Sequence, residues 1–125
     1  MTASGEMLVL AEQAVSEEFS DYFSDEELDV FDDPYEALAA MENGSWSSVV
    51  IAASYVGLRG LCSAVRRLQK GARLIVLCGP AMESEVRGMA GGIAAQGAID
   101  DYFIYPLTSN EWRSLTAADK DDAGA

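Results

Sequence analysis

The chain has 125 residues, of which 50% are hydrophobic and 23% are charged, and these proportions are typical of one globular domain rather than of a disordered chain. Its apolar runs are much shorter than the roughly 20 residues of a membrane span, and its first residues lack the basic segment of a signal peptide. We therefore expect a cytoplasmic domain over residues 7–116, with an extension over 1–6 and a disordered tail or truncated linker over 117–125.

The net charge of −13 arises entirely in the first half of the chain. Residues 1–58 contain thirteen Asp and Glu residues and no Lys or Arg, whereas residues 59–125 contain eight acidic and eight basic residues. A surface of this kind repels the phosphates of nucleic acids and anionic lipids, so we predict neither as a partner. We interpret the acidic half as a solvated face that aids solubility, with a basic protein partner as the alternative.

The residue types also restrict the chemistry that the chain can perform. It contains no His, which excludes Ser-His and Cys-His hydrolases and ordinary zinc sites. Cys62 and Cys78 match neither a metal-binding spacing nor a thioredoxin-like spacing. We predict that both are inert, buried thiols.

In the first half of the chain, the apolar run over residues 7–10 predicts a buried strand. A helix from Ser16 to about Phe23 is expected next, because apolar residues recur there four positions apart. A short strand over 28–31 follows. The next helix has a strong start signal, since Asp33 is a good N-cap, a Pro follows it and a Glu closes a capping box. This helix is predicted to end at Asn43.

The second half continues the alternation. In chain order, we predict a strand over 49–52, a helix over 58–70, a strand over 74–77, a helix over 83–96, a strand over 102–105 and a short helix that contains Trp112. Three glycines weaken the helix over 83–96, because each costs about 1 kcal/mol relative to Ala. We expect that helix to be frayed, kinked or held by a neighbour.

Strands that alternate with helices five times predict an α/β fold, in which a doubly wound five-stranded parallel sheet carries helices on both faces. In such sheets, ligands bind at the carboxyl ends of the strands. We therefore expect any functional site to lie where the strands end, at Glu12, Ala52, Cys78 and Tyr105.

Several stretches resemble the receiver domains of bacterial response regulators, over about residues 7–115. Gly97–Leu107 is similar to the family's Gly-Ala-Asp-Asp-Tyr-Leu-x-Lys-Pro-Phe stretch, with one extra residue. Tyr35–Leu38 resembles the start of its second helix, and Gly60-Leu61 resembles the opening of its third. The resemblance implies the flavodoxin-like strand order 2-1-3-4-5 and a role in two-component (phosphorelay) signal transduction.

The resemblance also implies which groups would perform receiver chemistry. Two acids after the first strand and an Asp after the third hold Mg²⁺, that Asp accepts the phosphoryl group, and a Thr or Ser and a Lys contact it. The corresponding positions here are Ala11 and Glu12, Ala52 or Ala53, Cys78 and Tyr105, followed by the family's Pro at Pro106. We therefore predict a degenerate phosphoacceptor pocket with no catalytic residue, no metal and no cofactor. Glu12 would be a remnant, and Tyr105 would cover the pocket with its hydroxyl in water.

We predict a pseudo-receiver that is not an enzyme, acts without phosphorylation and binds a protein partner or a fused effector domain. The resemblance places the contact, including that of a homodimer, on the fourth helix, fifth strand and fifth helix. The predicted contact residues are Val86, Met89, Ile93, Tyr102 and Trp112. Two alternatives stay open: a flavodoxin-like domain that binds a small ligand or an enzyme's substrate in the vacated crevice, and an acidic decoy for a basic protein.

Overall fold

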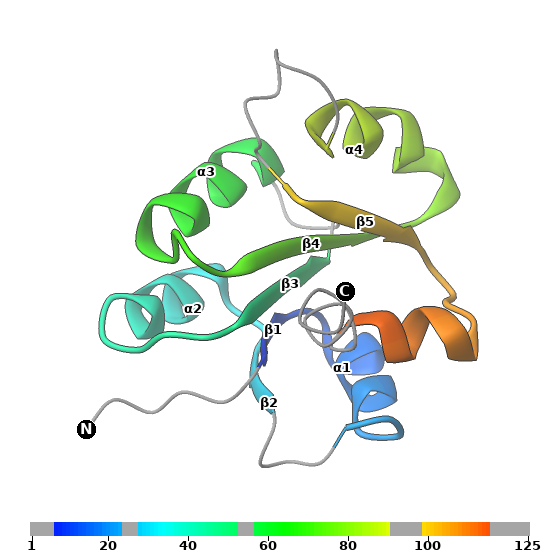
Figure 1. Cartoon of the computed structure of the whole chain (residues 1–125), viewed down its shortest axis with the longest axis horizontal. Helices are drawn as coiled ribbons and strands as arrows, with labels where there is room; N and C mark the ends of the chain where they lie inside the picture. The colour runs from blue at the N-terminus through cyan, green and yellow to red at the C-terminus, as the bar shows by residue number, and fades with distance from the viewer. Residues whose placement is uncertain (1–6, 24–27, 53–56, 91–98, 116–125) are drawn as a thin grey trace, which may run out of the picture.

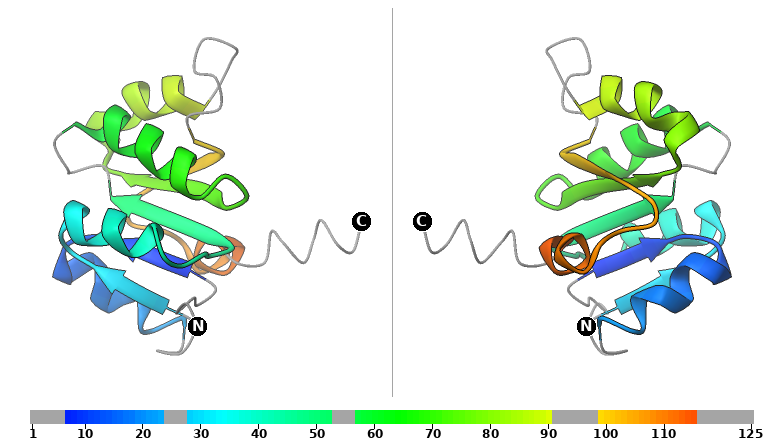
Figure 2. Two further views of the ribbon diagram at one scale, coloured as in Figure 1. Left: turned by 90° about the vertical axis from the view of Figure 1, so that its left-hand side faces the viewer. Right: turned by 90° about the vertical axis from the view of Figure 1, so that its right-hand side faces the viewer.

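The computed structural model of the chain describes residues 7–23, 28–52, 57–90 and 99–115. Five parallel strands form one sheet in the order β2-β1-β3-β4-β5 (Figure 1). The strands are β1 (Met7–Leu10), β2 (Leu28–Phe31), β3 (Ser48–Ala52), β4 (Arg73–Cys78) and β5 (Asp101–Ile104). Figure 2 shows β2 and β5 at opposite edges of the sheet. The predicted fold class and strand order are confirmed.

Helices cover both faces of this sheet (Figure 1). Their bounds are α1 (Gln13–Phe19), α2 (Pro34–Met41), α3 (Leu58–Leu68), the single 3₁₀ turn η1 (Pro80–Met82) and α4 (Glu83–Ala90). Residues 109–115 are also helical and are called the C-terminal helix below. Side chains of α2, α3 and α4 pack on one face, and side chains of α1 and the C-terminal helix pack on the other.

The central strands explain why the sheet is buried on both faces. All residues of β1 and β3 are buried, and neither strand contains a charged side chain. Alternate residues point to opposite faces of a strand, so Leu8 and Leu10 of β1 join one core cluster while Met7 and Val9 join the other. An uncharged strand therefore supplies apolar surface to two helical layers at once.

The start of α1 differs from its prediction. The helix begins at Gln13, with Glu12 as an extended N-cap residue, rather than at Ser16. The Ser16 hydroxyl lies within the first turns and donates a hydrogen bond to the carbonyl of Ala11 at 3.2 Å. The helix also ends at Phe19, where turns replace it, although Phe23 is still buried in the core as predicted. The apolar face of the helix was predicted correctly, but the predicted start of the helix lies three residues after the observed one.

The start of α2 agrees with its prediction. Asp33 is the N-cap residue, and its side chain accepts a hydrogen bond from the backbone N–H of Tyr35 at 2.9 Å. Pro34 occupies the first turn, where its missing N–H removes no helical bond. After Met41, the backbone N–H groups of Asn43 and Gly44 donate to the carbonyl of Ala40 and finish the helix.

Candidate functional site

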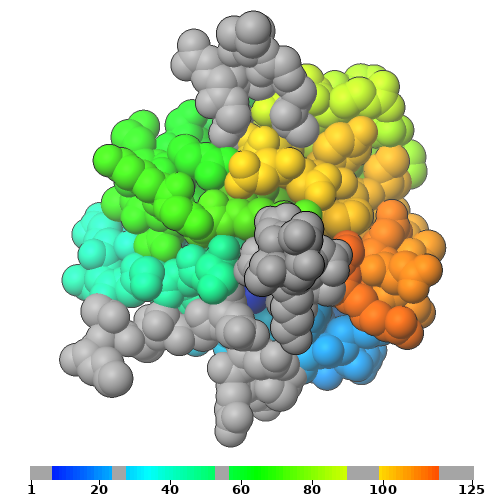
Figure 3. Space-filling view, in the orientation of Figure 1, coloured from blue at the N-terminus to red at the C-terminus, as the bar shows by residue number. Residues whose placement is uncertain are grey.

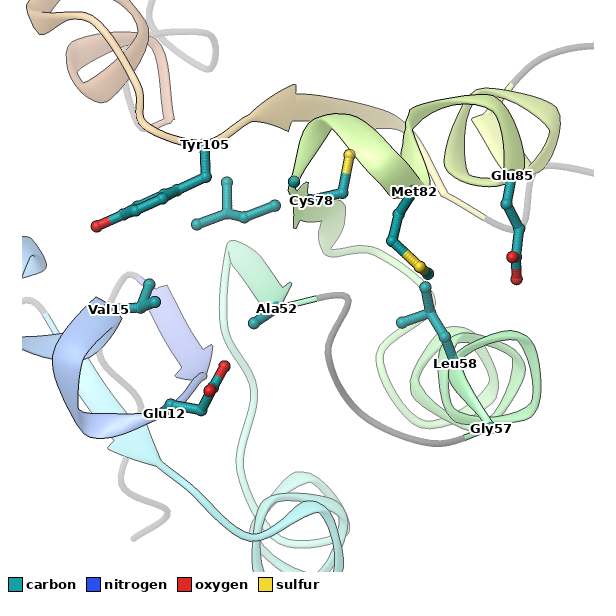
Figure 4. A pocket seen from close by; sticks show the side chains of 11 residues that line it. Glu12, Val15, Ala52, Gly57, Leu58, Cys78, Met82, Glu85 and Tyr105 are labelled. Atoms are coloured by element: carbon teal, nitrogen blue, oxygen red, sulfur yellow. The ribbon is translucent and has the colours of Figure 1, made fainter.

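A pocket of about 540 Å³ lies at the carboxyl ends of β1, β3, β4 and β5 (Figure 4). This edge of a doubly wound sheet is where ligand sites are expected. The residues that line it are Glu12, Val15, Ala52, Gly57, Leu58, Leu77, Cys78, Gly79, Met82, Glu85 and Tyr105. Most of these side chains are apolar, so the pocket is a hydrophobic hollow with a few polar groups.

Four of the positions expected at a receiver's phosphoacceptor site meet in this pocket, because Glu12, Ala52, Cys78 and Tyr105 all line it. Each lies at or just beyond the end of a different strand. Pro106 follows Tyr105 through a cis peptide bond. Ala53, the second candidate for the acceptor position, lies outside the described residues.

The lining residues supply little of what phosphoryl transfer requires. Ala52 presents a methyl group, which cannot accept a phosphoryl group. Glu12 and Glu85 carry the carboxylates of the lining, and they lie on different sides of the pocket in Figure 4. Mg²⁺ prefers several oxygen ligands in octahedral geometry. In the part of the chain that the structure describes, no cluster of three or more His, Cys, Asp or Glu side chains could hold a metal ion.

Tyr105 forms one side of the pocket, with its ring beside Val15 (Figure 4). Its backbone N–H donates to the carbonyl of Cys78 at 2.8 Å, which fixes the residue just past β5. Its hydroxyl donates to a carboxylate oxygen of Glu18 on α1. The hydroxyl was predicted to lie in water, and the structure adds a protein partner for it, an acid on α1 that lies 87 positions earlier in the sequence.

Both thiols are buried and free, as predicted. Burial raises the pKa of Cys62 to about 12, and Arg66 opposes this effect only in part. Burial also raises the pKa of Cys78, with a further contribution from the nearby carboxylate of Glu83. Because the thiolate is the reactive form, these pKa directions favour the interpretation of Cys62 and Cys78 as structural side chains.

The two acids at the start of β5, Asp100 and Asp101, lie at the other end of the sheet. Asp100 accepts a hydrogen bond from the backbone N–H of Leu74, near the start of β4, and forms an ion pair with Arg66 at 3.0 Å. Asp101 forms an ion pair with Arg73 at 2.8 Å. These acids are therefore committed to structural contacts and do not replace the missing carboxylates of the pocket.

The predicted partner-contact residues need a correction. Val86 and Met89 of α4 are fully buried in the core, and Trp112 is only 2% exposed. These three side chains hold the domain together and cannot touch a partner in this conformation, because their apolar faces already pack on the sheet or on α1. Tyr102 is half-buried, and its hydroxyl accepts a hydrogen bond from Nε of Arg87 at 3.2 Å. Ile93 lies outside the described residues.

Several lining residues were not identified as site residues from the sequence. They include Val15, Leu58 and Met82. Leu58 begins the helix that follows β3, and Met82 ends the 3₁₀ turn that follows β4. Their place directly after strand ends was the signal that could have found them, since helix starts surround the crevice in this fold.

No protein-family model and no curated protein sequence matches the chain. Solved structures match its fold. A CheY-like response regulator receiver domain protein from Methanospirillum hungatei JF-1 is 18% identical, covers 98% of this chain and 95% of its own, and gives a TM-score of 0.70. The REC domain of AraT, a response regulator from Geobacillus stearothermophilus, is 19% identical. It covers 99% of this chain and 97% of its own, and gives a TM-score of 0.72.

A third match carries an enzyme's name. The adenylate cyclase structure from Rhodopirellula baltica is 14% identical, with 96% of each chain covered and a TM-score of 0.70. At these identities the likeness defines the fold, and the fold is that of response-regulator receiver domains, as the sequence resemblance implied. Among the described residues, no helix has the length and apolar character needed to cross a membrane.

Proposed function

We propose that the chain is a phosphorylation-independent receiver domain, which regulates a protein partner or a fused effector domain through direct contact and is not itself an enzyme. The observation that carries this proposal is the composition of the pocket. Where a receiver needs an acceptor carboxylate, a hydroxyl and a Lys, the pocket has Ala52, Cys78 and Tyr105. The scaffold is kept while the chemistry is replaced, which favours a role in binding.

The partner contact is proposed on the edge of the sheet formed by β5 and α4. Tyr102, Phe103 and Ile104 on this edge strand are all partly exposed. Arg87 on α4 adds an exposed guanidinium beside Tyr102. A partly exposed apolar edge strand is a ready surface for another protein. These residues replace the buried Val86, Met89 and Trp112 as candidates for the contact.

The test is incubation with acetyl phosphate and Mg²⁺, followed by intact-mass measurement. We expect the mass to stay that of the untreated protein, because no lining residue matches the acceptor carboxylate. A typical receiver domain treated in parallel must gain one phosphoryl group for the experiment to be valid. A phosphoryl adduct on this chain would contradict the proposal.

Sedimentation equilibrium on the same samples reports the contact. If the chain pairs with itself through this edge, Tyr102→Asp weakens the association and the phosphodonor leaves it unchanged. Tyr35→Asp is the matched control, because Tyr35 is 82% exposed and lies on α2, away from this edge. A wild-type chain that stays monomeric at high concentration contradicts the homodimer and restricts the contact to a different protein.

A further inference from the structure

The pocket at the strand ends has the size and lining of a small-molecule site. Its volume of about 540 Å³ lies within the range of roughly 300–1,000 Å³ that such sites occupy. Ala52 and Leu77 lie at the ends of adjacent strands, and Val15, Leu58 and Met82 extend from the surrounding helical segments (Figure 4). An apolar ligand body would replace water against these side chains, which is favourable in proportion to the area covered.

The charged side chains around the pocket indicate which polar group a bound small molecule would carry. The lining includes the carboxylates of Glu12 and Glu85 and contains no Lys or Arg. In Figure 4, the carboxylate of Glu12 points toward the hollow beside Ala52. Two further acids lie close by, since Glu18 accepts the Tyr105 hydroxyl and Glu83 acts on Cys78. An anion would be repelled here, whereas a cation would be attracted by the carboxylates.

We propose that this pocket binds a small apolar amine, with its hydrophobic body against Leu58, Leu77 and Met82 and its ammonium group near Glu12. The positive charge of the ammonium group is opposite to that of the phosphoryl group which the resemblance to receivers would place here. The inference goes beyond the proposed function and does not rest on it, because the pocket would bind the amine whether or not the domain contacts a partner.

Three probes with one hydrophobic body and different charges test the proposal. The probes are 4-phenylbutylamine, 4-phenylbutan-1-ol and 4-phenylbutyrate, which present a cation, a neutral hydroxyl and an anion at neutral pH. Each is titrated into ¹⁵N-labelled protein while the amide NMR signals are followed. We expect saturable shifts at Ala52, Leu58, Cys78 and Gly79, with the amine binding at least about tenfold more tightly than the carboxylate.

Two variants locate the site, and a third tests the charge. Gly79 lines the pocket, and a Cβ built there meets no atom within 4 Å, so Gly79→Leu fills the hollow without backbone strain. Gly71→Leu is the matched control, because Gly71 has the same free space but lines a different hollow beside Arg73. Gly79→Leu should abolish amine binding, and Gly71→Leu should leave it unchanged. Glu12→Gln should reduce the affinity for the amine toward that for the alcohol.

Each outcome decides the proposal. It is overturned if the carboxylate binds as tightly as the amine, if Gly79→Leu retains wild-type shifts, or if the amine causes no saturable shift in the folded wild type. None of these results depends on the phosphodonor experiment. A phosphoryl adduct would overturn the proposed function and leave amine binding to be judged by its own titration.

Discussion

Replacing Trp112 by Ala should lower the free energy of unfolding by about 3–5 kcal/mol, the usual cost of deleting a large buried aromatic side chain. The Trp112 ring packs edge-on against Phe19, with centroids 4.8 Å apart, and stacks on Tyr22 at 5.0 Å. These contacts join the C-terminal helix to the end of α1 and to the turn that follows it, and the two helices lie side by side in Figures 1 and 3. Loss of the ring leaves a cavity between them.

Urea unfolding followed by circular dichroism measures this effect. Tyr35→Ala is the control, because it removes an aromatic ring that is 82% exposed and should change stability by no more than about 0.5 kcal/mol. Trp112→Phe keeps a ring in the cavity and should cost less than Trp112→Ala. If Trp112→Ala is as stable as Tyr35→Ala, the C-terminal helix does not depend on this contact.

The second large effect is expected at Gln69, which is buried although it is polar. Its Nε2 donates to the carbonyls of Met41 at 2.9 Å and Gly44 at 2.8 Å, and its Oε1 accepts from the backbone N–H of Trp46 at 3.2 Å. One side chain thus joins the end of α3 to the segment that links α2 to β3. Buried backbone groups that lose their partners are costly.

Gln69→Leu should therefore reduce the free energy of unfolding by about 2–4 kcal/mol, since it leaves three backbone groups without this partner. Gln69→Glu is also expected to destabilise the domain, because a carboxylate of the same shape cannot donate to the two carbonyls. The control is Gln13→Leu, since Gln13 is exposed and its side chain donates a hydrogen bond to the exposed Glu17 one helical turn away. Equal urea midpoints for Gln69→Leu and Gln13→Leu would contradict this role.

Much of the fold could be predicted because its signals are local. An uncharged run rich in β-branched residues, such as Val49–Ala52, favours a strand covered on both faces, and it forms most of β3 in the centre of the sheet. The N-cap at Asp33 was also predicted, because its hydrogen bond joins residues only two positions apart in the sequence. The start of α1 was misplaced because Ser16 has the side chain of a typical N-cap residue, whereas Glu12 holds that position without a side-chain bond that caps the helix.

The pocket could be predicted in part, because its position follows from the predicted strands. The topology of a parallel sheet brings strand ends together, so Glu12, Ala52, Cys78 and Tyr105 were placed in one site without any knowledge of their side-chain contacts. The hydrogen bond from Tyr105 to Glu18 joins residues 87 positions apart in the sequence, and no local pattern reports it. Pairings of this kind depend on how α1 lies against the strand ends.

The burial of Trp112 was missed for a related reason. From the sequence, Trp112 was predicted to be one of the residues that contact a partner. In the structure, Phe19 at the end of α1 and Tyr22 in the turns that follow it provide the matching aromatic surface. The excess of aromatic side chains near the end of α1 was the available signal, because a buried aromatic face requires an apolar neighbour from another element.

We propose that this crevice binds neither a phosphoryl group nor the metal ion that accompanies one in a typical receiver. The most direct measurement is the amide NMR spectrum of the ¹⁵N-labelled protein with Mg²⁺ and beryllofluoride, which imitates a phosphoryl group, compared with NaCl at equal ionic strength. We predict no saturable shift at Glu12, Ala52 or Cys78, because the pocket lining offers one carboxylate on each side and no acceptor. Saturable shifts centred on these three amides would contradict the account.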